Sequence, residues 1–243
     1  MNIAQAGRAY GRLHLARDKT LDDPYLADPA WRLEHLYRIK SKDKKDSPFI
    51  LNPLQEQIAG VIKKLKVAHK PVRLIILKPR QVGCTTFFCV RELDQCFWTE
   101  NQFAAVIAHR PDSAHTIFAE IVKFCYDKIP TRYQKKAYND SVCQLGWRST
   151  HSQLKVTTDI HGITPNLLHL TEVSRFNNAK ELIDEALQGV PLMSGEVIQE
   201  STANGVGGYF YDAWNEAIED PESVWQPLFL KWWEHPDYTL LVP

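Results

Sequence analysis

After residue 48, apolar positions alternate between two spacings along the chain, and each spacing predicts one kind of element. Short apolar, β-branched runs predict strands, and apolar residues every three or four positions predict helices. The predicted strands are 72–77, 103–108, 167–171, 196–202 and 226–231, with shorter ones near 142–145 and 154–157. The predicted helices are 53–66, about 85–99, 112–128, 179–188 and 207–218. Strands separated by helices in this order predict an α/β fold with a mainly parallel sheet that helices cover on both faces.

Residues 1–47 show no such alternation. Residues 29–40 carry apolar side chains at helical spacing, which predicts a short helix that buries Leu33, Leu36 and Tyr37. The charged run SKDKKDS that follows predicts a solvated linker. We therefore expect this N-terminal segment to be peripheral to the main domain.

The length and composition are typical of a soluble globular protein. A chain of 243 residues is long enough for one large α/β domain, and 44% of them are hydrophobic. No apolar run approaches the roughly 18 residues of a membrane-spanning helix, and the N-terminus lacks the apolar region of a signal peptide. The five cysteines include no C-x-x-C pair, which predicts reduced thiols in a cytoplasmic protein and no zinc site.

Neither the net charge nor the histidines indicate a binding function by themselves. The chain has 29 basic and 29 acidic residues, whereas a protein that grips DNA tightly alone is usually basic. Any contact with nucleic acid must therefore come from local patches. The pairs His109 and His115, and His161 and His169, lack the spacing of zinc ligands on a helix.

Aromatic residues near the C-terminus allow two interpretations. Trp225, Trp232 and Trp233 could stack on nucleic-acid bases, but they interleave with Leu228 and Leu230 at strand spacing. This pattern favours packing in the core or against a subdomain.

The most informative segment is the loop KPRQVGCTT that follows the apolar run 72–77. A strand, a tight loop and a helix in this order form a P-loop, which directs backbone N–H groups at a polyphosphate. The usual pattern G-x-x-x-x-G-K-[ST] is broken twice, because Lys78 replaces the first glycine and Cys84 replaces the lysine. Gly83 and Thr85 keep their places. A generic strand–turn–helix with accidental charges is the alternative.

The residue types in this loop suit a phosphate and a metal ion. Gly83 permits close approach of the backbone to phosphate, and Thr85 can offer its hydroxyl to Mg²⁺. Lys78 can supply the neutralising ammonium from the start of the loop. Arg80 is a second cation, able to contact phosphate or an acidic partner.

A second motif, LLHLTE, ends at Glu172. An apolar strand that ends in a carboxylate has the form of a Walker B element, whose acid activates water beside the metal. Thr171 occupies the position where most such strands have aspartate, which weakens metal binding without excluding it. A carboxylate that only caps the following turn is the alternative for Glu172.

Two further segments carry polar groups at element ends. The run STANG, residues 201–205, follows a predicted strand and suits a sensor of the γ-phosphate, although Asn-Gly is also an ordinary turn. In FILNPLQEQ, Gln55 rather than Gln57 is placed to read an adenine edge through paired amide hydrogen bonds, although a surface glutamine would look the same.

The order and spacing of these four elements resemble the ATPase domain of phage terminase large subunits, over about residues 48–235. The resemblance rests on KPRQVGCTT, HLTEVSRF and ESTANG. It implies a RecA-like P-loop NTPase core with a small N-terminal or lid subdomain over residues 1–47. Residues 236–243 resemble the start of the linker to a nuclease domain with an RNase H-like fold, which nothing in this chain supplies, so no DNA cutting is expected.

The resemblance also implies roles for individual residues. Glu172 would activate water, with Lys78 and Arg80 completing the catalytic set. Thr85 and, through water, Glu172 would hold Mg²⁺. The implied ATP-binding residues are Gln55, Lys78, Pro79, Arg80, Gln81, Val82, Gly83, Cys84, Thr85 and Thr86. The implied coupling residues, which would link loss of the γ-phosphate to movement, are Ser201, Thr202, Ala203, Asn204 and Gly205.

The function implied by the resemblance is hydrolysis of ATP to translocate double-stranded viral DNA into a procapsid. The implied partners are DNA, the portal protein, the small terminase subunit and further copies of this chain in a ring at the procapsid vertex, in the host cytoplasm. Arg132 or Arg148 could enter a neighbouring subunit's site, although a surface ion pair is the simpler use of either.

Two other functions remain open from the sequence. The first lobe of a superfamily 2 helicase would also have a glutamine element, a P-loop and an acidic box, but G-K-T and D-E-x-[DH] are absent. A scaffold that binds ATP without hydrolysing it is favoured by the missing loop lysine and the missing aspartate. Glu172 and Lys78 argue against it, because a pure binder needs no water-activating acid.

Overall fold

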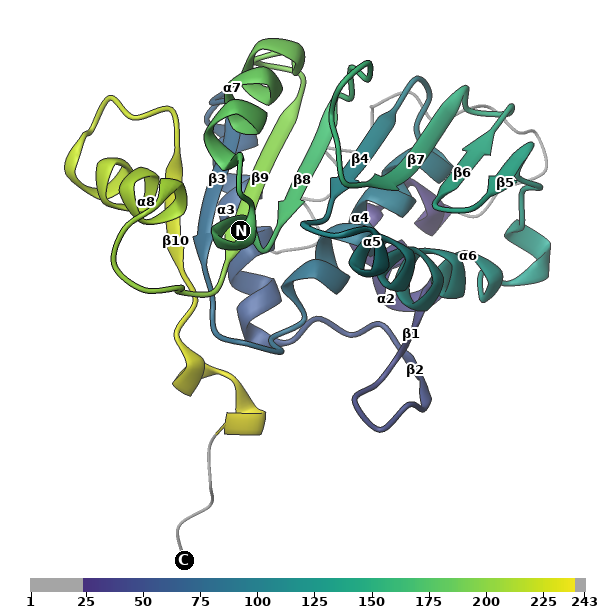
Figure 1. Ribbon diagram of the computed structural model, residues 1–243. Coiled ribbons are helices and arrows are strands. Elements are labelled where there is room, and N and C mark those ends of the chain that lie inside the picture. The colour runs from purple at the N-terminus through teal and green to yellow at the C-terminus, as the bar shows by residue number, and fades with distance from the viewer. Residues whose placement is uncertain (1–23, 239–243) are drawn as a thin grey trace, which may run out of the picture.

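A computed structural model describes residues 24–238, and its centre is an eight-stranded sheet (Figure 1). The strands are β3 (Val72–Leu77), β4 (Phe103–Ile107), β5 (Asn139–Ser141), β6 (Gln144–Trp147), β7 (Ser152–Thr157), β8 (Leu167–Thr171), β9 (Glu196–Ser201) and β10 (Gln226–Phe229). Their order in the sheet is β10-β3-β9-β8-β4-β7-β6-β5. The first six are parallel, and β6 and β5 are antiparallel additions. The prediction of an α/β fold with a mainly parallel sheet is confirmed.

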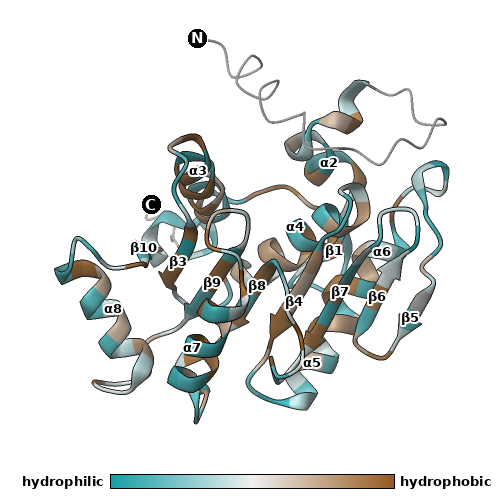
Figure 2. Ribbon diagram, turned by 90° about the horizontal axis from the view of Figure 1, so that it is seen from above, coloured by the Kyte–Doolittle hydropathy of each residue, from teal (hydrophilic) through white to brown (hydrophobic). Residues whose placement is uncertain are grey.

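Helices cover both faces of this sheet because the central strands are apolar on both sides. Leu74 and Ile76 belong to one buried cluster, and Ile75 between them belongs to a second cluster on the other face. The first cluster is covered by α3 (Pro53–Val67) and α4 (Cys84–Trp98), and the second by α7 (Ala179–Gly189) and α8 (Tyr209–Glu219). Figure 2 shows α3 and α4 on one side of the row of apolar strands and α7 and α8 on the other. Within residues 24–238, no helix is long and apolar enough to cross a membrane.

Two predicted elements differ in detail from the structure. The predicted helix 112–128 is one continuous helical stretch with three parts. They are α5 (Pro111–Ile117), a π-helical segment (Phe118–Lys123) and α6 (Phe124–Asp127). The strand predicted near 142–145 is present as β6 but begins two residues later, at Gln144, because Cys143 has a φ of 66° and lies in the turn between β5 and β6.

The N-terminal region is a helix followed by a hairpin. Helix α2 (Pro29–Leu36) ends at Tyr37, whose extended backbone leads into β1 (Arg38–Lys40), and β1 pairs antiparallel with β2 (Asp46–Pro48). The prediction of one helix over 29–40 is therefore wrong beyond Leu36. Leu36 and Tyr37 are buried as expected, whereas Leu33 is only partly buried. Residues 1–23 of the predicted N-terminal segment, and 239–243 of the predicted linker, lie outside the described residues.

A buried ion pair fixes α2 to α4. The guanidinium of Arg32 donates two hydrogen bonds to the carboxylate of Asp94, Nε to Oδ1 at 2.8 Å and Nη2 to Oδ2 at 2.6 Å. The hydroxyl of Tyr37 donates to the same carboxylate, and the third nitrogen of Arg32 donates to the carbonyl of Leu26. Both charged side chains are almost fully buried, 3% and 2% exposed. Every polar group of the pair is thus satisfied, as burial of charge requires.

The C-terminal tryptophans do not all pack as predicted. Trp225 is buried, but Trp232 and Trp233 are 52% and 50% exposed in a short 3-10 helix (Trp232–Glu234). The expectation of core packing is wrong for these two, because β10 ends at Phe229 and the chain then leaves the sheet. Leu230 is the last fully buried residue before that exit.

Loss of the Arg32–Asp94 pair tests whether the N-terminal region is part of the folded core. We expect Asp94→Ala to lower the free energy of unfolding by about 3–5 kcal/mol, because it leaves the guanidinium of Arg32 buried and unpaired. Urea denaturation of the purified chain measures this. Asp46→Ala, which removes the partner of Arg38 in an exposed pair, is the control and should leave the midpoint almost unchanged. Equal midpoints for the two variants would contradict the expectation.

Candidate phosphate-binding and catalytic site

The candidate site lies at the carboxyl ends of β3, β8 and β9, where parallel sheets carry their ligand sites. The loop after β3 is anchored to the sheet at its start, since the N–H of Lys78 donates to the carbonyl of Ser201 at 3.0 Å. The loop ends at Gly83, whose φ of 73° turns the chain directly into α4. No side chain caps this helix start, so the first N–H groups of α4 are available to an anion.

The far side of the loop is held by the start of α3. Asn52 caps that helix, and its side-chain amide donates to the carbonyl of Val82 at 3.1 Å. Gln55 Nε2 donates to the carbonyl of Gly83 at 2.8 Å, and Gln55 Oε1 accepts from the N–H of Asn52. Both polar atoms of this amide are bonded within the chain, so only its second N–H and the second lone pair of its oxygen are left for an adenine edge. In this structure Gln55 restrains the loop.

Lys78, at the start of the loop, forms ion pairs with two carboxylates. Its Nζ lies 3.0 Å from Glu172 Oε1 and 3.1 Å from Glu200 Oε2. Burial alone would lower the pKa of Lys78, but the two carboxylates outweigh it and the pKa is raised. The ammonium is therefore charged at neutral pH and stands beside the acid at the end of β8.

Glu200 is the functional-site candidate that the sequence interpretation missed. It is 0% exposed, on the central strand β9. Burial raises the pKa of its carboxyl, but Lys78, His169 and Thr171 outweigh that effect and lower the pKa to about 2. The signal that could have revealed it is a charged residue inside the strand EVIQES, since a buried strand normally excludes an unpaired charge.

Two hydroxyls converge on the same carboxylate. Thr85 Oγ1 donates to Glu200 Oε1 at 2.8 Å, and Thr171 Oγ1 donates to it at 2.7 Å. The two hydroxyl oxygens lie 3.1 Å apart. The first turn of α4 and the ends of β8 and β9 therefore meet at one polar centre.

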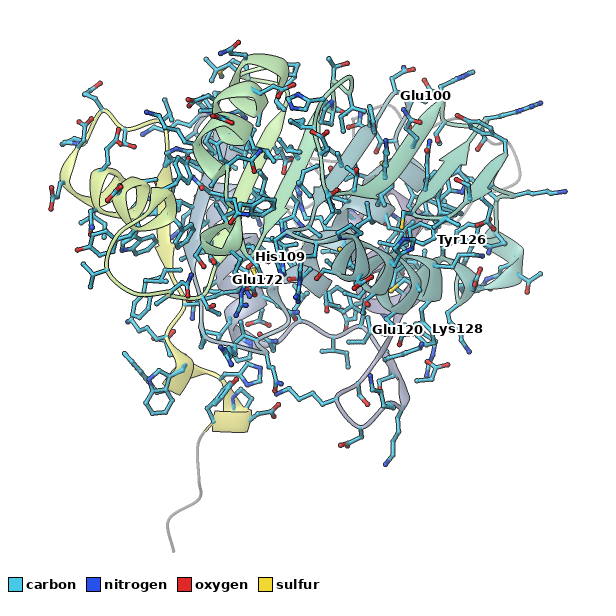
Figure 3. The ribbon with its side chains drawn as sticks, viewed as in Figure 1. Glu100, His109, Glu120, Tyr126, Lys128 and Glu172 are labelled. Carbon is cyan, nitrogen blue, oxygen red and sulfur yellow. The ribbon has the colours of Figure 1, made fainter. Side chains whose placement is uncertain are left out.

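Glu172 stands at the rim of this centre, beside a cationic cavity. Its backbone is left-handed (φ 59°, ψ 44°), and its carboxylate is 3.5 Å from the Nε of Arg175. A cavity of about 300 Å³ opens here, lined by Arg80, Gln81, His109, Arg110, Glu172, Arg175 and Thr202. Figure 3 shows His109 and Glu172 close together at this edge of the sheet. Three guanidinium groups around one carboxylate suit a bound polyanion whose reacting end faces Glu172.

The residues after β9 are bonded to the segment that follows Glu172. Ser201 Oγ donates to Ser174 Oγ at 2.7 Å, and Asn204 Nδ2 donates to the carbonyl of Ser174 at 3.1 Å. Ser174 Oγ in turn donates to the carbonyl of Thr202. The segment that follows Glu172 is thus joined to the STANG segment by the hydrogen bonds of Ser174.

The remaining predicted residues fall into two groups. Cys84 and Val82 are buried and face the core, whereas Pro79, Gln81 and Thr86 are partly or fully exposed along the loop. Arg132 and Arg148 are exposed and lie over the rings of Tyr133 and Tyr138, at the β5–β6 end of the sheet, away from the loop. Neither contributes to this chain's own site, and a role in a neighbouring subunit stays a prediction.

Oxygen ligands at this centre fit Mg²⁺ only in combination with a nucleotide. No group of three or more His, Cys, Asp or Glu side chains within the described residues could hold a metal by itself. The Thr85 hydroxyl and the Glu200 carboxylate are hard oxygen donors, and Mg²⁺ characteristically combines one or two protein oxygens with waters and substrate phosphates.

The loop strand β3 lies beside β9, and β9 beside β8, an order consistent with a RecA-like α/β fold. No protein-family model and no curated protein sequence matches the chain. Among solved structures it is similar to the large terminase of bacteriophage HK97, with a TM-score of 0.65, 16% identity and 81% of this chain covered. The chain spans 42% of the length of that protein.

Other solved terminases share the fold. The ATPase domain of the Thermus phage P74-26 large terminase matches 68% of this chain and 77% of its own length, with a TM-score of 0.54 and 16% identity. The large terminase of another thermophilic bacteriophage, solved in complex with ATP-γ-S, matches 77% of this chain and 46% of its own length, with a TM-score of 0.53 and 11% identity. The fold is thus that of phage large terminase ATPase domains.

The loop geometry gives a prediction for Gly83. A Cβ there would lie 2.7 Å from Gln55 Nε2, and φ is positive, so we expect Gly83→Ala to lower the free energy of unfolding by about 1–3 kcal/mol. Gly60→Ala is the matched control, since Gly60 lies inside α3 with nothing within 4 Å of the new Cβ. It should instead stabilise by about 0.5–1 kcal/mol. Urea denaturation compares the two, and stabilisation by both would show that the loop is not restrained by Gln55.

Proposed function

We propose that this chain is the ATPase motor domain of a phage terminase large subunit, which hydrolyses ATP with Mg²⁺ to translocate double-stranded DNA into a procapsid. The observation that carries the proposal is the position of Lys78. It supplies the loop's cation from the first loop position and contacts Glu172, the acid at the end of β8. The shared fold of terminase ATPase domains supports the same function.

In the proposed binding step, the polyphosphate of ATP lies against the loop and the start of α4. Backbone N–H groups and the helix dipole favour negative charge there. Lys78 turns from the carboxylates to the phosphates, and Arg80 adds a second cation at the cavity rim. Thr85 offers its hydroxyl to Mg²⁺, which when bound supplies charge neutralisation at the phosphates.

In the proposed chemical step, Glu172 accepts a proton from the attacking water. Its partial exposure and its place at the cavity wall leave room for a water molecule between the carboxylate and the γ-phosphate. Arg175 and Arg110 line the same cavity and would stabilise charge on the phosphoryl oxygens. Ser201, Thr202 and Asn204 would transmit the loss of the γ-phosphate through their contacts with Ser174.

In the proposed assembly, copies of this chain form a ring on the portal protein, with the small terminase subunit and DNA as partners, in the host cytoplasm. At a net charge of zero, one chain binds DNA weakly, and the ring supplies the effective concentration. Arg132 or Arg148 of one copy would then reach the site of the next.

A second candidate, a scaffold that binds ATP without hydrolysing it, is favoured by Cys84. Its thiol is buried at the position of the usual loop lysine, and burial raises its pKa well above the usual value, so it carries no charge toward phosphate. The two candidates differ in whether the chain hydrolyses ATP at all. Only the motor has an ATPase activity that the loss of Glu172 would abolish.

The test compares two variants of the site with two surface variants. We expect Glu172→Gln to keep ATP binding and to lower Mg²⁺-dependent hydrolysis by about 10²–10⁴-fold, because a general base is lost. We expect Lys78→Ala to weaken ATP binding by about 10- to 100-fold, through loss of charged hydrogen bonds to phosphate. Glu181→Gln and Lys64→Ala, both exposed, are the matched controls.

Phosphate release and binding of a fluorescent ATP analogue are measured at high protein concentration with and without DNA, and thermal unfolding confirms that each variant is folded. Binding without turnover in the unaltered chain, even with DNA, would favour the scaffold. Unchanged binding and turnover in both site variants would rule out this site.

A further inference from the structure

The carboxylate of Glu200 lies beside position 171, where the sequence has a threonine instead of an acid. In a Walker B element an aspartate just before the catalytic glutamate orders the metal, and here that position is Thr171. We propose that Glu200, on the neighbouring strand β9, takes over this role and holds the Mg²⁺ of bound ATP through Thr85 and a metal-bound water. The inference rests on the proposed function and names a metal-positioning residue for it.

The register between β8 and β9 explains how Glu200 can take the role of an acid at position 171. Thr171 and Glu200 are direct partners across the β8–β9 pair. The longer side chain of Glu200 reaches across that pair and accepts a hydrogen bond from the hydroxyl of Thr171 at 2.7 Å, so its carboxylate lies next to the side chain at position 171. From there it accepts from Thr85, the loop hydroxyl proposed for Mg²⁺.

Burial shows that this carboxylate is not an ordinary surface acid. Glu200 is 0% exposed, and its Oε2 accepts no well-aligned hydrogen bond from the described residues. Among the described residues, the basic groups within 4 Å of its carboxylate are Lys78, 3.1 Å from Oε2, and His169, whose Nε2 is 3.4 Å from Oε1. An under-satisfied carboxylate oxygen beside a hydroxyl is a position that a hard cation or its water can complete.

Charge balance connects Lys78 and the metal. Without nucleotide, the Lys78 ammonium compensates both Glu172 and Glu200, so the three groups together carry one negative charge. When Lys78 turns to the phosphates, Glu200 loses its compensating cation. Glu200 and Thr85 would then hold the Mg²⁺ that accompanies ATP, and the ion would supply the positive charge that Lys78 had supplied.

Mg²⁺-dependent binding of a fluorescent ATP analogue tests this assignment. Affinity is measured in Mg²⁺ and in EDTA for the unaltered chain, Glu200→Gln and Glu181→Gln. The Mg²⁺ effect is the ratio of the affinity in Mg²⁺ to the affinity in EDTA. We expect Glu200→Gln to lower this ratio by at least about tenfold, because a group that orients metal ligands is lost. Its affinity in EDTA should stay unchanged. Glu181→Gln, which neutralises an exposed acid outside the site, is the matched control and should keep the Mg²⁺ effect.

A second variant, in which the acid is moved from position 200 to position 171, tests the inference if Glu200→Gln alone is unstable. The double variant Thr171→Asp, Glu200→Gln returns a carboxylate to β8 and should regain the Mg²⁺ effect. A folded Glu200→Gln with an unchanged Mg²⁺ effect would overturn the inference while leaving the proposed function intact, as would a folded double variant without any Mg²⁺ effect. An unaltered chain that binds the analogue in neither condition would overturn the proposed function itself.

Discussion

The contact of Lys78 with Glu172 and Glu200 is the interaction on which the site depends. Lys78 directly follows β3, Glu172 directly follows β8 and Glu200 is the second-last residue of β9, so the ion pairs tie the ends of three neighbouring strands to one another. A carboxylate as buried as Glu200 is tolerated only with a cation beside it, since an unpaired buried charge costs several kcal/mol. The displaced loop lysine is therefore a structural requirement of β9 as well as a candidate phosphate ligand.

The other restraints of the loop act from outside this triad. Asn52 and Gln55 hold the carbonyls of Val82 and Gly83, so the loop is fixed by the sheet at its start and by α3 at its end. Near the far end of α4, Asp94 is bound by Arg32. The helix whose first turn faces the phosphate site is thus held at both ends, which preorganises the site before any ligand binds.

Much of the fold was predictable because apolar spacing and strand–helix alternation are local signals. The sequence assigns Lys78 and Glu172 to the same candidate site, at the ends of strands, but it does not predict the ion pair between them. It did not predict Glu200, because its role depends on register between strands separated in sequence. The hairpin after Leu36 was missed since its pairing is similarly non-local, and Trp232 was misplaced because strand spacing continues past the point where the chain leaves the sheet.

The segment between β9 and α8 combines permissive backbone with free volume. Gly207 and Gly208 have φ values of 113° and 83°, and beside them lies a cavity of about 380 Å³ whose walls include Phe176 and Trp214. A close-packed interior transmits strain but has little free volume to absorb it. Here the free volume adjoins the most permissive stretch of backbone, while β10 stays paired with β3. Free volume and permissive backbone therefore coincide beside Ser174, between the end of β9 and the start of α8.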